Sequence, residues 1–168
     1  MAQRKSLKND ACPMARALDI VGDQWSLLIV RDAFDGMKRF GEFQQSLGVA
    51  KNILADRLKW LVQEGVLDLV PASDGSLYQA YVLSAKGKAL FPVMVGLRQW
   101  GEAHLYAKGE PHSVLVERDS GKPVPKIALR TRDGQPLDAD LTFVKKLPVK
   151  TLKTPEPASA ADPKSPPV

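Results

Sequence analysis

The 168-residue sequence predicts an α+β fold: a winged helix-turn-helix with additional N- and C-terminal helices, then a small β-rich unit and a disordered tail. Three observations support this prediction. Apolar residues recur at helical spacing in four successive stretches between residues 13 and 64. A three-residue break, Gly48–Ala50, separates the last two stretches, as a helix-turn-helix requires. Two short β-rich runs around an Asp-Gly pair then predict a hairpin, the wing.

Two helices are expected at the start of this domain. Pro13 opens the first and Gly22 closes it, and its apolar residues share one face: Met14, Ala17, Leu18 and Val21. The second follows Asp23, a residue type that caps helix N-termini, and ends at Asp35–Gly36. The second helix is apolar nearly all round, which predicts that it is central in the core.

A third, short helix is expected from about Arg39 to Leu47, and a fourth from about Lys51 to Gly65. Each has apolar residues on one side only, which predicts one buried face per helix. These residues are Phe40, Phe43 and Leu47 in the third helix, and Leu54, Leu58, Leu61 and Val62 in the fourth.

Two strands are predicted after the fourth helix, at residues 66–70 and 78–83, joined by residues 71–76 with their Asp-Gly turn signal. Ser84 can cap a fifth, long helix, which Pro92 would bend. An apolar stripe is expected along that helix: Leu90, Met94, Leu97, Trp100 and Gly101.

Composition divides the chain into four segments. We expect residues 1–11 to be a flexible basic arm and residues 12–108 to form the winged-helix domain. Residues 111–147 are dense in Pro, Gly and β-forming residues, which predicts a small β-hairpin extension. Residues 148–168 contain six prolines and no aromatic residue. Such a segment buries too little apolar area to offset the entropy of ordering, so we expect a disordered tail.

The charge and cysteine content restrict the partners and the compartment. A net charge of +5 and a pI of about 9.4 fit a polyanionic partner, although a solvated basic surface gives the same values. No apolar run approaches the roughly 20 residues of a transmembrane helix, and the N-terminus lacks the apolar segment of a secretory signal. The single cysteine, Cys12, cannot form an intrachain disulfide. We expect a cytoplasmic protein that does not associate with membranes.

Short motifs occur in unbroken order over residues 12–108: Cys12-Pro13, Ala17–Gly22, Trp25–Arg31, Arg39–Phe43, Leu54–Leu58, Glu64-Gly65, Tyr81–Ser84, Gly87 and Leu97–Gly101. Their joint order and spacing resemble the HxlR-type transcriptional regulators, a MarR-like family of bacterial winged helix-turn-helix proteins. The resemblance implies a homodimer whose first and last helices are dimerisation helices. It also implies binding to palindromic operators on double-stranded DNA near regulated genes.

Residues at the start of the fourth helix are the predicted base contacts, because a recognition helix places its N-terminal side chains in the major groove. Lys51 and Arg57 can donate to guanine or phosphate, and Asn52 can pair with adenine. Val49 or Ala50 could touch a thymine methyl group.

Lys38 and Arg39 stand where the third helix begins, and we predict that they anchor phosphates. The wing offers Ser73 and Ser76 but no Arg or Lys, so its contribution is expected to be small. The alternative is that the charged residues of the fourth helix are only its solvated side. The position of this helix in a helix-turn-helix favours DNA contact instead.

Cys12 precedes Pro13 at a helix start, and a helix N-terminus favours a thiolate. The family pattern includes a cysteine here, which in some members is thought to sense oxidants or electrophiles. A single thiol leaves an intersubunit disulfide, a mixed disulfide or an adduct. The alternative is a small, half-buried apolar residue near the dimer interface. A second kind of effector, an apolar molecule, could bind between helices near Met14, Trp25 and Trp100.

The extension contains two similar stretches, residues 116–124 and 129–137, which predict two strand-turn-strand units. Longer family members carry a similar extension with paired cysteines that resembles a zinc ribbon. Those cysteines are absent here, and His104 and His112 are too few to hold zinc, so we expect no metal or cofactor. The unit would have to pack on the helices or on the other subunit through Val114, Val116, Ile127, Leu129 and Phe143.

The sequence offers little support for an enzyme. It has no phosphate-binding glycine loop, HExxH motif or nucleophile elbow, and Cys12 with two distant histidines is a frequent chance combination. We therefore expect no enzymatic activity. The alternative to a DNA-binding regulator is a winged helix used only for protein contacts. It would show no salt-dependent binding to duplex DNA.

Overall fold

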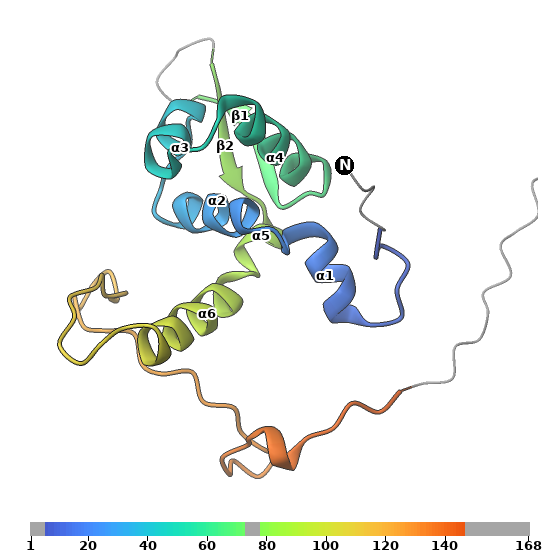
Figure 1. Ribbon diagram of the computed structural model, residues 1–168, viewed down its shortest axis with the longest axis vertical. Coiled ribbons are helices and arrows are strands. Elements are labelled where there is room, and N and C mark those ends of the chain that lie inside the picture. Colours follow the sequence, from blue (N-terminus) through green and yellow to red (C-terminus); the bar gives the residue numbers. More distant parts are fainter. Residues whose placement is uncertain (1–5, 73–77, 147–168) are drawn as a thin grey trace, which may run out of the picture. The chain divides into compact units, whose positions relative to one another are not determined.

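The computed structural model describes residues 6–72 and 78–146. The chain divides into two units, Met1–Leu137 and Asp138–Val168, which are taken separately here. Figure 1 shows the elements in chain order: α1 (Pro13–Val21), α2 (Gln24–Phe34), α3 (Phe40–Leu47), α4 (Lys51–Gln63), β1 (Leu67–Pro71), β2 (Gln79–Leu83), α5 (Ala85–Lys88), α6 (Phe91–His104) and the 3-10 turn η1 (Ala139–Leu141). This arrangement confirms the α+β class and the winged helix-turn-helix.

The boundary between α1 and α2 follows local sequence. Pro13 occupies the first turn of α1, where its missing N–H costs no hydrogen bond. Asp23 caps α2, since its Oδ1 accepts from the backbone N–H of Trp25 at 3.1 Å and of Ser26 at 3.0 Å. Both predicted helix starts are confirmed.

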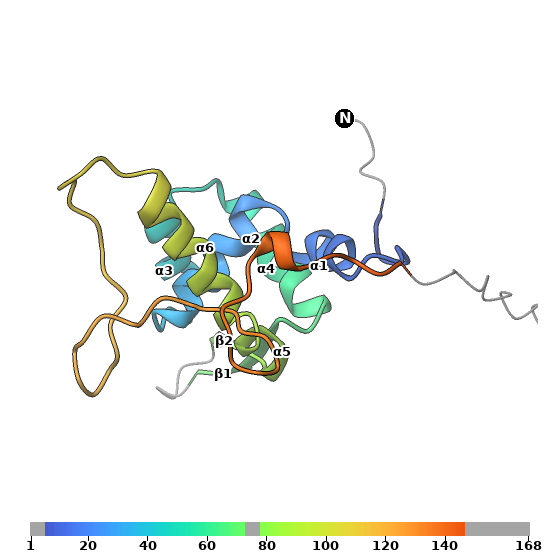
Figure 2. The same ribbon diagram turned by 90° about the horizontal axis from the view of Figure 1, so that it is seen from below.

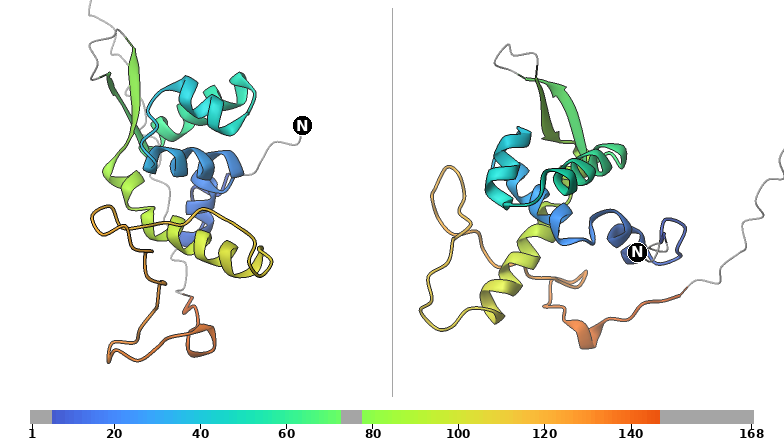
Figure 3. Two further views of the ribbon diagram at one scale, coloured as in Figure 1. Left: turned by 90° about the vertical axis from the view of Figure 1, so that its left-hand side faces the viewer. Right: turned by 45° about the horizontal axis from the view of Figure 1, so that its top comes forward.

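Helix α2 is central in the first unit, as its apolar sequence predicted. In Figure 3 it lies between α3 and α4 on one side and α1 and α6 on the other. The core is built around it from ten residues that are at most 7% exposed: Val21, Ile29, Val30, Phe43, Val49, Leu54, Leu58, Leu61, Val66 and Leu67.

The turn between α3 and α4 depends on Gly48. This residue ends α3 with a φ of 60°, in the left-handed region that favours glycine, and its N–H donates to the Gln44 carbonyl. Val49 and Ala50 complete the break, and α4 begins at Lys51. The structure therefore confirms the predicted three-residue break of the helix-turn-helix.

The wing is an antiparallel pair in which Leu67 is opposite Leu83 and Pro71 is opposite Gln79. Beyond it, Ser84 caps α5 and its hydroxyl donates to the Gly65 carbonyl at 2.6 Å. A Cβ on Gly87 would lie 2.2 Å from the carbonyl oxygen of Val66. Helix α5 therefore crosses the start of the wing in direct backbone contact, which only glycine permits.

The expected single long helix from Ser84, bent at Pro92, is wrong. The structure has two helices, α5 and α6, with Ala89 and Leu90 between them. Pro92 stands in the first turn of α6, where a proline begins a helix more readily than it continues one.

Residues 105–137 follow α6 and form no extended strand in the described chain. The two predicted strand-turn-strand units each reduce to one isolated bridge, Val116 with Pro123 and Arg130 with Pro136. Figure 2 shows this segment leaving α6 and turning back past it. Four of the apolar residues expected to pack on the helices or on the other subunit are at least 46% exposed in the single chain: Val114, Val116, Ile127 and Leu129.

In the second unit, the described residues 138–146 contain the short turn η1, which the Asp138 carboxylate caps. Phe143 in this unit is 88% exposed. Residues 1–5 of the predicted arm (residues 1–11) and the predicted tail at residues 148–168 lie outside the described residues. No helix in the described part of the chain is long and apolar enough to span a bilayer.

Candidate nucleic-acid interface

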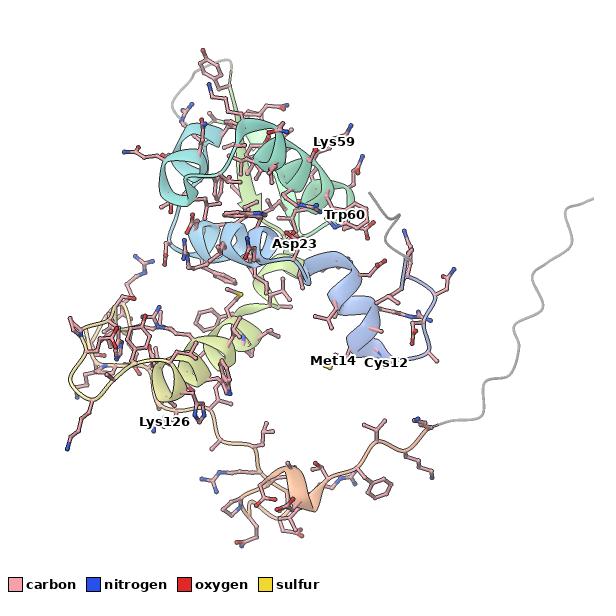
Figure 4. All side chains as sticks on the ribbon, in the orientation of Figure 1. Cys12, Met14, Asp23, Lys59, Trp60 and Lys126 are labelled. Carbon is pink, nitrogen blue, oxygen red and sulfur yellow. The ribbon has the colours of Figure 1, made fainter. Side chains whose placement is uncertain are left out.

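Helix α4 has one buried and one exposed side. Leu54, Leu58 and Leu61 are 0% exposed and face the core. Asp56 and Lys59 are exposed on the other side, and Figure 4 shows Lys59 pointing away from α2. The amphipathic spacing read from the sequence is thus oriented with its polar side outward.

The N-terminal end of α4 is open and electropositive. Lys51 and Asn52 are exposed there. Ala50 is the N-cap residue, no side chain caps the helix, and its first turn holds no acidic residue. Because uncapped N–H groups and the helix dipole attract anions, this end suits a phosphate or the acceptor edge of a base.

Arg57 lies at the edge between the two sides of α4, and its side chain is 37% exposed. Three residues after Leu54 and four before Leu61, it lies on the inner flank of α4. Its Nε is buried, has no hydrogen-bond partner among the described residues and lies 3.6 Å from Oδ1 of Asp23. Arg57 therefore contributes an ion pair between α4 and the start of α2.

The placement of Val49 differs from the prediction. It is 7% exposed and belongs to the core, because the Gly48 turn directs it inward between the two helices. Ala50 is exposed. Of the two proposed contacts to a thymine methyl group, only Ala50 is on the surface.

Lys38 and Arg39 precede α3 and are fixed by backbone contacts. The N–H groups of Lys38 and Arg39 donate to Oε2 of Glu42 at 2.7 and 2.9 Å. These two hydrogen bonds, Lys38 first, hold the pKa of Glu42 below its usual 4.5. The Lys38 carbonyl accepts from Tyr81 in the wing at 2.8 Å, while its side chain is exposed.

Trp60 was not singled out from the sequence. Its indole Nε1 donates to the carbonyl of Ile20 at 3.0 Å, which joins α4 to the end of α1 (Figure 4). The sequence did contain a signal, a tryptophan on the flank of an otherwise polar side of the helix. Because a buried indole N–H needs a hydrogen-bond acceptor, such a residue indicates a contact with a neighbouring element. With Arg57, it fixes α4 to the α1–α2 junction at two points.

Cys12 is exposed and is the N-cap residue of α1, and its N–H donates to Oδ1 of Asp10 at 2.8 Å. Figure 4 places it with Met14 at the end of α1 that is remote from α4. The remaining predicted contacts of the wing, Ser73 and Ser76, lie outside the described residues.

The three residues predicted near an effector are distributed over three helices. Met14 on α1 is 70% exposed, Trp25 on α2 packs against the core, and Trp100 on α6 is 55% exposed. None of them lines the apolar cavity between α2 and α6. The described residues contain no group of three or more His, Cys, Asp or Glu that could hold a metal.

Comparison with known proteins identifies the family. The HxlR-like helix-turn-helix model matches residues 20–109, more than half of the chain. An uncharacterized HTH-type transcriptional regulator of Mycobacterium tuberculosis, Rv3095, is 36% identical over 126 residues, covering 75% of this chain and 80% of the relative.

Two solved structures are also similar. PA1607, a candidate transcription factor, has a TM-score of 0.80 and 58% identity, covering 84% of this chain and 99% of its own. The redox regulator HypR, in its reduced form, has a TM-score of 0.52 and 25% identity, covering 56% of this chain and 94% of its own. From the motifs, the winged helix-turn-helix and these matches together, the chain belongs to the HxlR-like helix-turn-helix family of transcriptional regulators.

Proposed function

We propose that the protein is a sequence-specific regulator that binds a pseudo-palindromic operator as a homodimer. The observation that carries this proposal is the open N-terminal end of α4, where exposed Lys51 and Asn52 follow the Gly48 turn while the opposite side of the helix is buried. A helix held in this way can enter the major groove with its first turn leading.

The contacts divide by chemistry. Lys51, Asn52 and Ala50 read base edges, while Lys38 and Arg39 bind phosphate on the same strand. Ser73 and Ser76 of the wing add weaker contacts. Val49 is buried and acts on binding through the position of α4, while Arg57, whose side chain is 37% exposed, donates to guanine or phosphate. Lys59, exposed two residues after Arg57, is an additional candidate for a phosphate contact.

Exposed apolar residues on two helices support the homodimer. Met14 and Leu18 on α1 are 70% and 44% exposed, and Val93, Leu97 and Trp100 on α6 are 50–55% exposed. The α6 residues have i, i+4, i+7 spacing and share one face, as helices that pair with a second copy do. A two-fold dimer would set two α4 helices about 34–36 Å apart, one DNA turn.

The remaining features complete the proposal. The regulator acts in the cytoplasm without catalytic activity. Its winged-helix domain, residues 12–108, lies between a basic arm, residues 1–11, and an extension, residues 111–147, which a Pro-rich tail at residues 148–168 follows. Its signal is a thiol-reactive compound at Cys12 or a small apolar effector. The exposed thiol and the likeness to HypR, a redox regulator, support the first signal.

Selection of bound duplexes from a random pool, followed by titration of the enriched site, tests DNA binding. We expect a two-fold symmetric site, and Lys51→Ala should weaken binding at least tenfold. Lys126→Ala is the matched control, because it removes the same charge next to α6 and away from α4 (Figure 4). An affinity that does not fall with rising salt, or equal losses in both variants, would support the protein-contact alternative.

The thiol signal is tested separately with Cys12→Ser. Diamide should release wild-type protein from its operator and leave this variant bound. Equal release of both proteins would exclude Cys12 as the sensor and leave DNA binding unaffected.

A further inference from the structure

An apolar cavity of about 350 Å³, open to solvent on one side, lies between α2, α6 and the segment after α6 in the first unit. Leu27 and Phe34 of α2 form one wall, and Phe91 and Gly101 of α6 form a second. The third wall comes from the segment after α6, where Tyr106, His112 and Leu115 line the space. The Phe34 and Phe91 rings, 5.4 Å apart between centroids, join the first two walls.

Polar contacts hold the third wall in place. The Arg98 guanidinium on α6 donates to the carbonyl and hydroxyl oxygens of Ser113, the hydroxyl at 2.8 Å. The Tyr106 and His112 rings lie 4.8 Å apart, which closes the loop between them. The segment after α6 is thus fixed against the helix and leaves a space beside it.

The two arginines that line the cavity are both engaged in ion pairs. Arg31 contacts Oδ1 of buried Asp32 at 2.7 Å, and Arg98 contacts Glu102 at 2.8 Å. Neither guanidinium is therefore available to neutralise an incoming anion. The rest of the lining is mainly aliphatic and aromatic, so a neutral, apolar molecule gains most from entering.

We propose that this cavity is a binding site for a neutral aromatic molecule of about two rings. An apolar cavity of roughly 150 Å³ accommodates benzene, and this one is a little more than twice as large. Phe34, Phe91 and Tyr106 offer ring faces to such a molecule. The site is distinct from the position near Met14, Trp25 and Trp100 and does not depend on DNA binding.

The proposed dimer face of α6 does not account for the cavity. Of the three residues that carry that face, Val93 and Trp100 do not line the cavity and Leu97 does, whereas Met94 and Gly101, which line the cavity, do not belong to the face. Successive residues of a helix are rotated by about 100°, which directs these two pairs to different sides of α6. A second copy that covers this face would lie at the Leu97 edge of the cavity and would leave the walls from α2 and from the segment after α6 to a small molecule.

Gly101 provides a variant that fills the cavity without disturbing the core. A Cβ at this position meets no atom within 4 Å, so the side chain of Gly101→Leu would extend into open space. Replacing a glycine within a helix also favours the helix. Gly41→Leu is the matched control, because its Cβ likewise meets no atom and it lies on α3.

Calorimetric titration of the full chain tests the proposal, with 1-naphthol as the neutral probe and 1-naphthoate as its anionic counterpart. We expect saturable binding of one 1-naphthol per chain and at least tenfold weaker binding of 1-naphthoate. Gly101→Leu should weaken 1-naphthol binding at least tenfold with an unchanged circular dichroism spectrum, and Gly41→Leu should bind like wild type.

Absence of saturable 1-naphthol binding, or equal binding by Gly101→Leu and wild type, would overturn the proposal. Sedimentation of the same proteins measures their oligomeric state and so tests whether a second copy of the chain occupies the cavity instead. If Gly101→Leu dissociates the dimer and 1-naphthol does not bind, the cavity receives a second copy and the proposal fails.

Discussion

The winged-helix core and the segment after α6 are stabilised in different ways. Core residues such as Phe43 and Leu58 are 0% exposed, so apolar burial stabilises that region. In residues 105–137 apolar side chains such as Leu129, at 67% exposure, remain in solvent. That segment depends on hydrogen bonds to α6, chiefly from Arg98 and Gln99. The difference indicates that unfolding of the segment can be separated from unfolding of the core.

Phe43→Ala should have the largest effect and tests the first half of this comparison. The ring is fully buried and meets Tyr81 edge-on at 6.3 Å, so its loss should lower the free energy of unfolding by about 3–5 kcal/mol. Leu129→Ala, at an exposed position, should change it by less than about 0.5 kcal/mol. Urea denaturation followed by circular dichroism measures both, and similar values would contradict the comparison.

Trp60→Phe tests whether one hydrogen bond at the edge of the core matters. The substitution removes the hydrogen bond to the Ile20 carbonyl but keeps an aromatic ring, so it should lower the free energy of unfolding by about 1 kcal/mol. The neighbouring Lys59→Ala, exposed on the outer side, serves as the control. If Trp60→Phe lowers the free energy of unfolding no more than Lys59→Ala does, the hydrogen bond between α1 and α4 contributes nothing to stability.

Gln99→Ala tests the second half of the comparison. Gln99 donates to the Pro125 carbonyl at 3.0 Å and accepts from the Ile127 N–H at 2.9 Å, so its loss should speed hydrogen exchange at Ile127 several-fold. The melting temperature should remain within about 2 °C of wild type. A drop in melting temperature comparable to that of Phe43→Ala would mean that the segment and the core unfold together.

Glu42→Gln should have the smallest effect, visible as a change with pH. Because the folded-state pKa of Glu42 is depressed, its carboxylate stabilises the fold above the unfolded-state value of 4.5. That stabilisation is lost as the pH falls through the lower folded-state pKa. In urea titrations the stability difference between wild type and variant should therefore be constant near neutral pH and shrink as the pH falls below 4.5. A difference independent of pH would indicate another cause.

The sequence predicted the core well. A helix with one buried face has apolar residues at a regular spacing, and that spacing is the signal from which helices are predicted. Asp23 as a cap, the Gly48 break and the Leu54, Leu58 and Leu61 face are all confirmed. In the segment after α6, the turn signals placed both chain reversals correctly. They could not predict strands, because strand pairing depends on burial that this segment lacks.

The candidate site was less predictable than the core. A helix is predicted from several residues that repeat at one spacing, whereas the orientation of a single side chain has no such repeated signal. Arg57 has a long side chain on a helix flank, and its ion pair with Asp23, which lies 34 positions earlier in the chain, leaves no local signal in the sequence. Val49 lies in a turn, where no helical periodicity predicts whether a side chain is buried or exposed. The cavity between α2 and α6 combines three separate segments of the chain, so no local motif could have indicated it.

The contact at Gly87 has a consequence for the choice of target sequence. Since α6 begins three residues after the end of α5, any side chain at position 87 would displace α5 from Val66 and tilt α6 with it. In a dimer joined through α6, that tilt would alter the separation of the two half-sites that the protein prefers. Variation at this one position could therefore change the preferred spacer length in an operator while leaving every base contact intact.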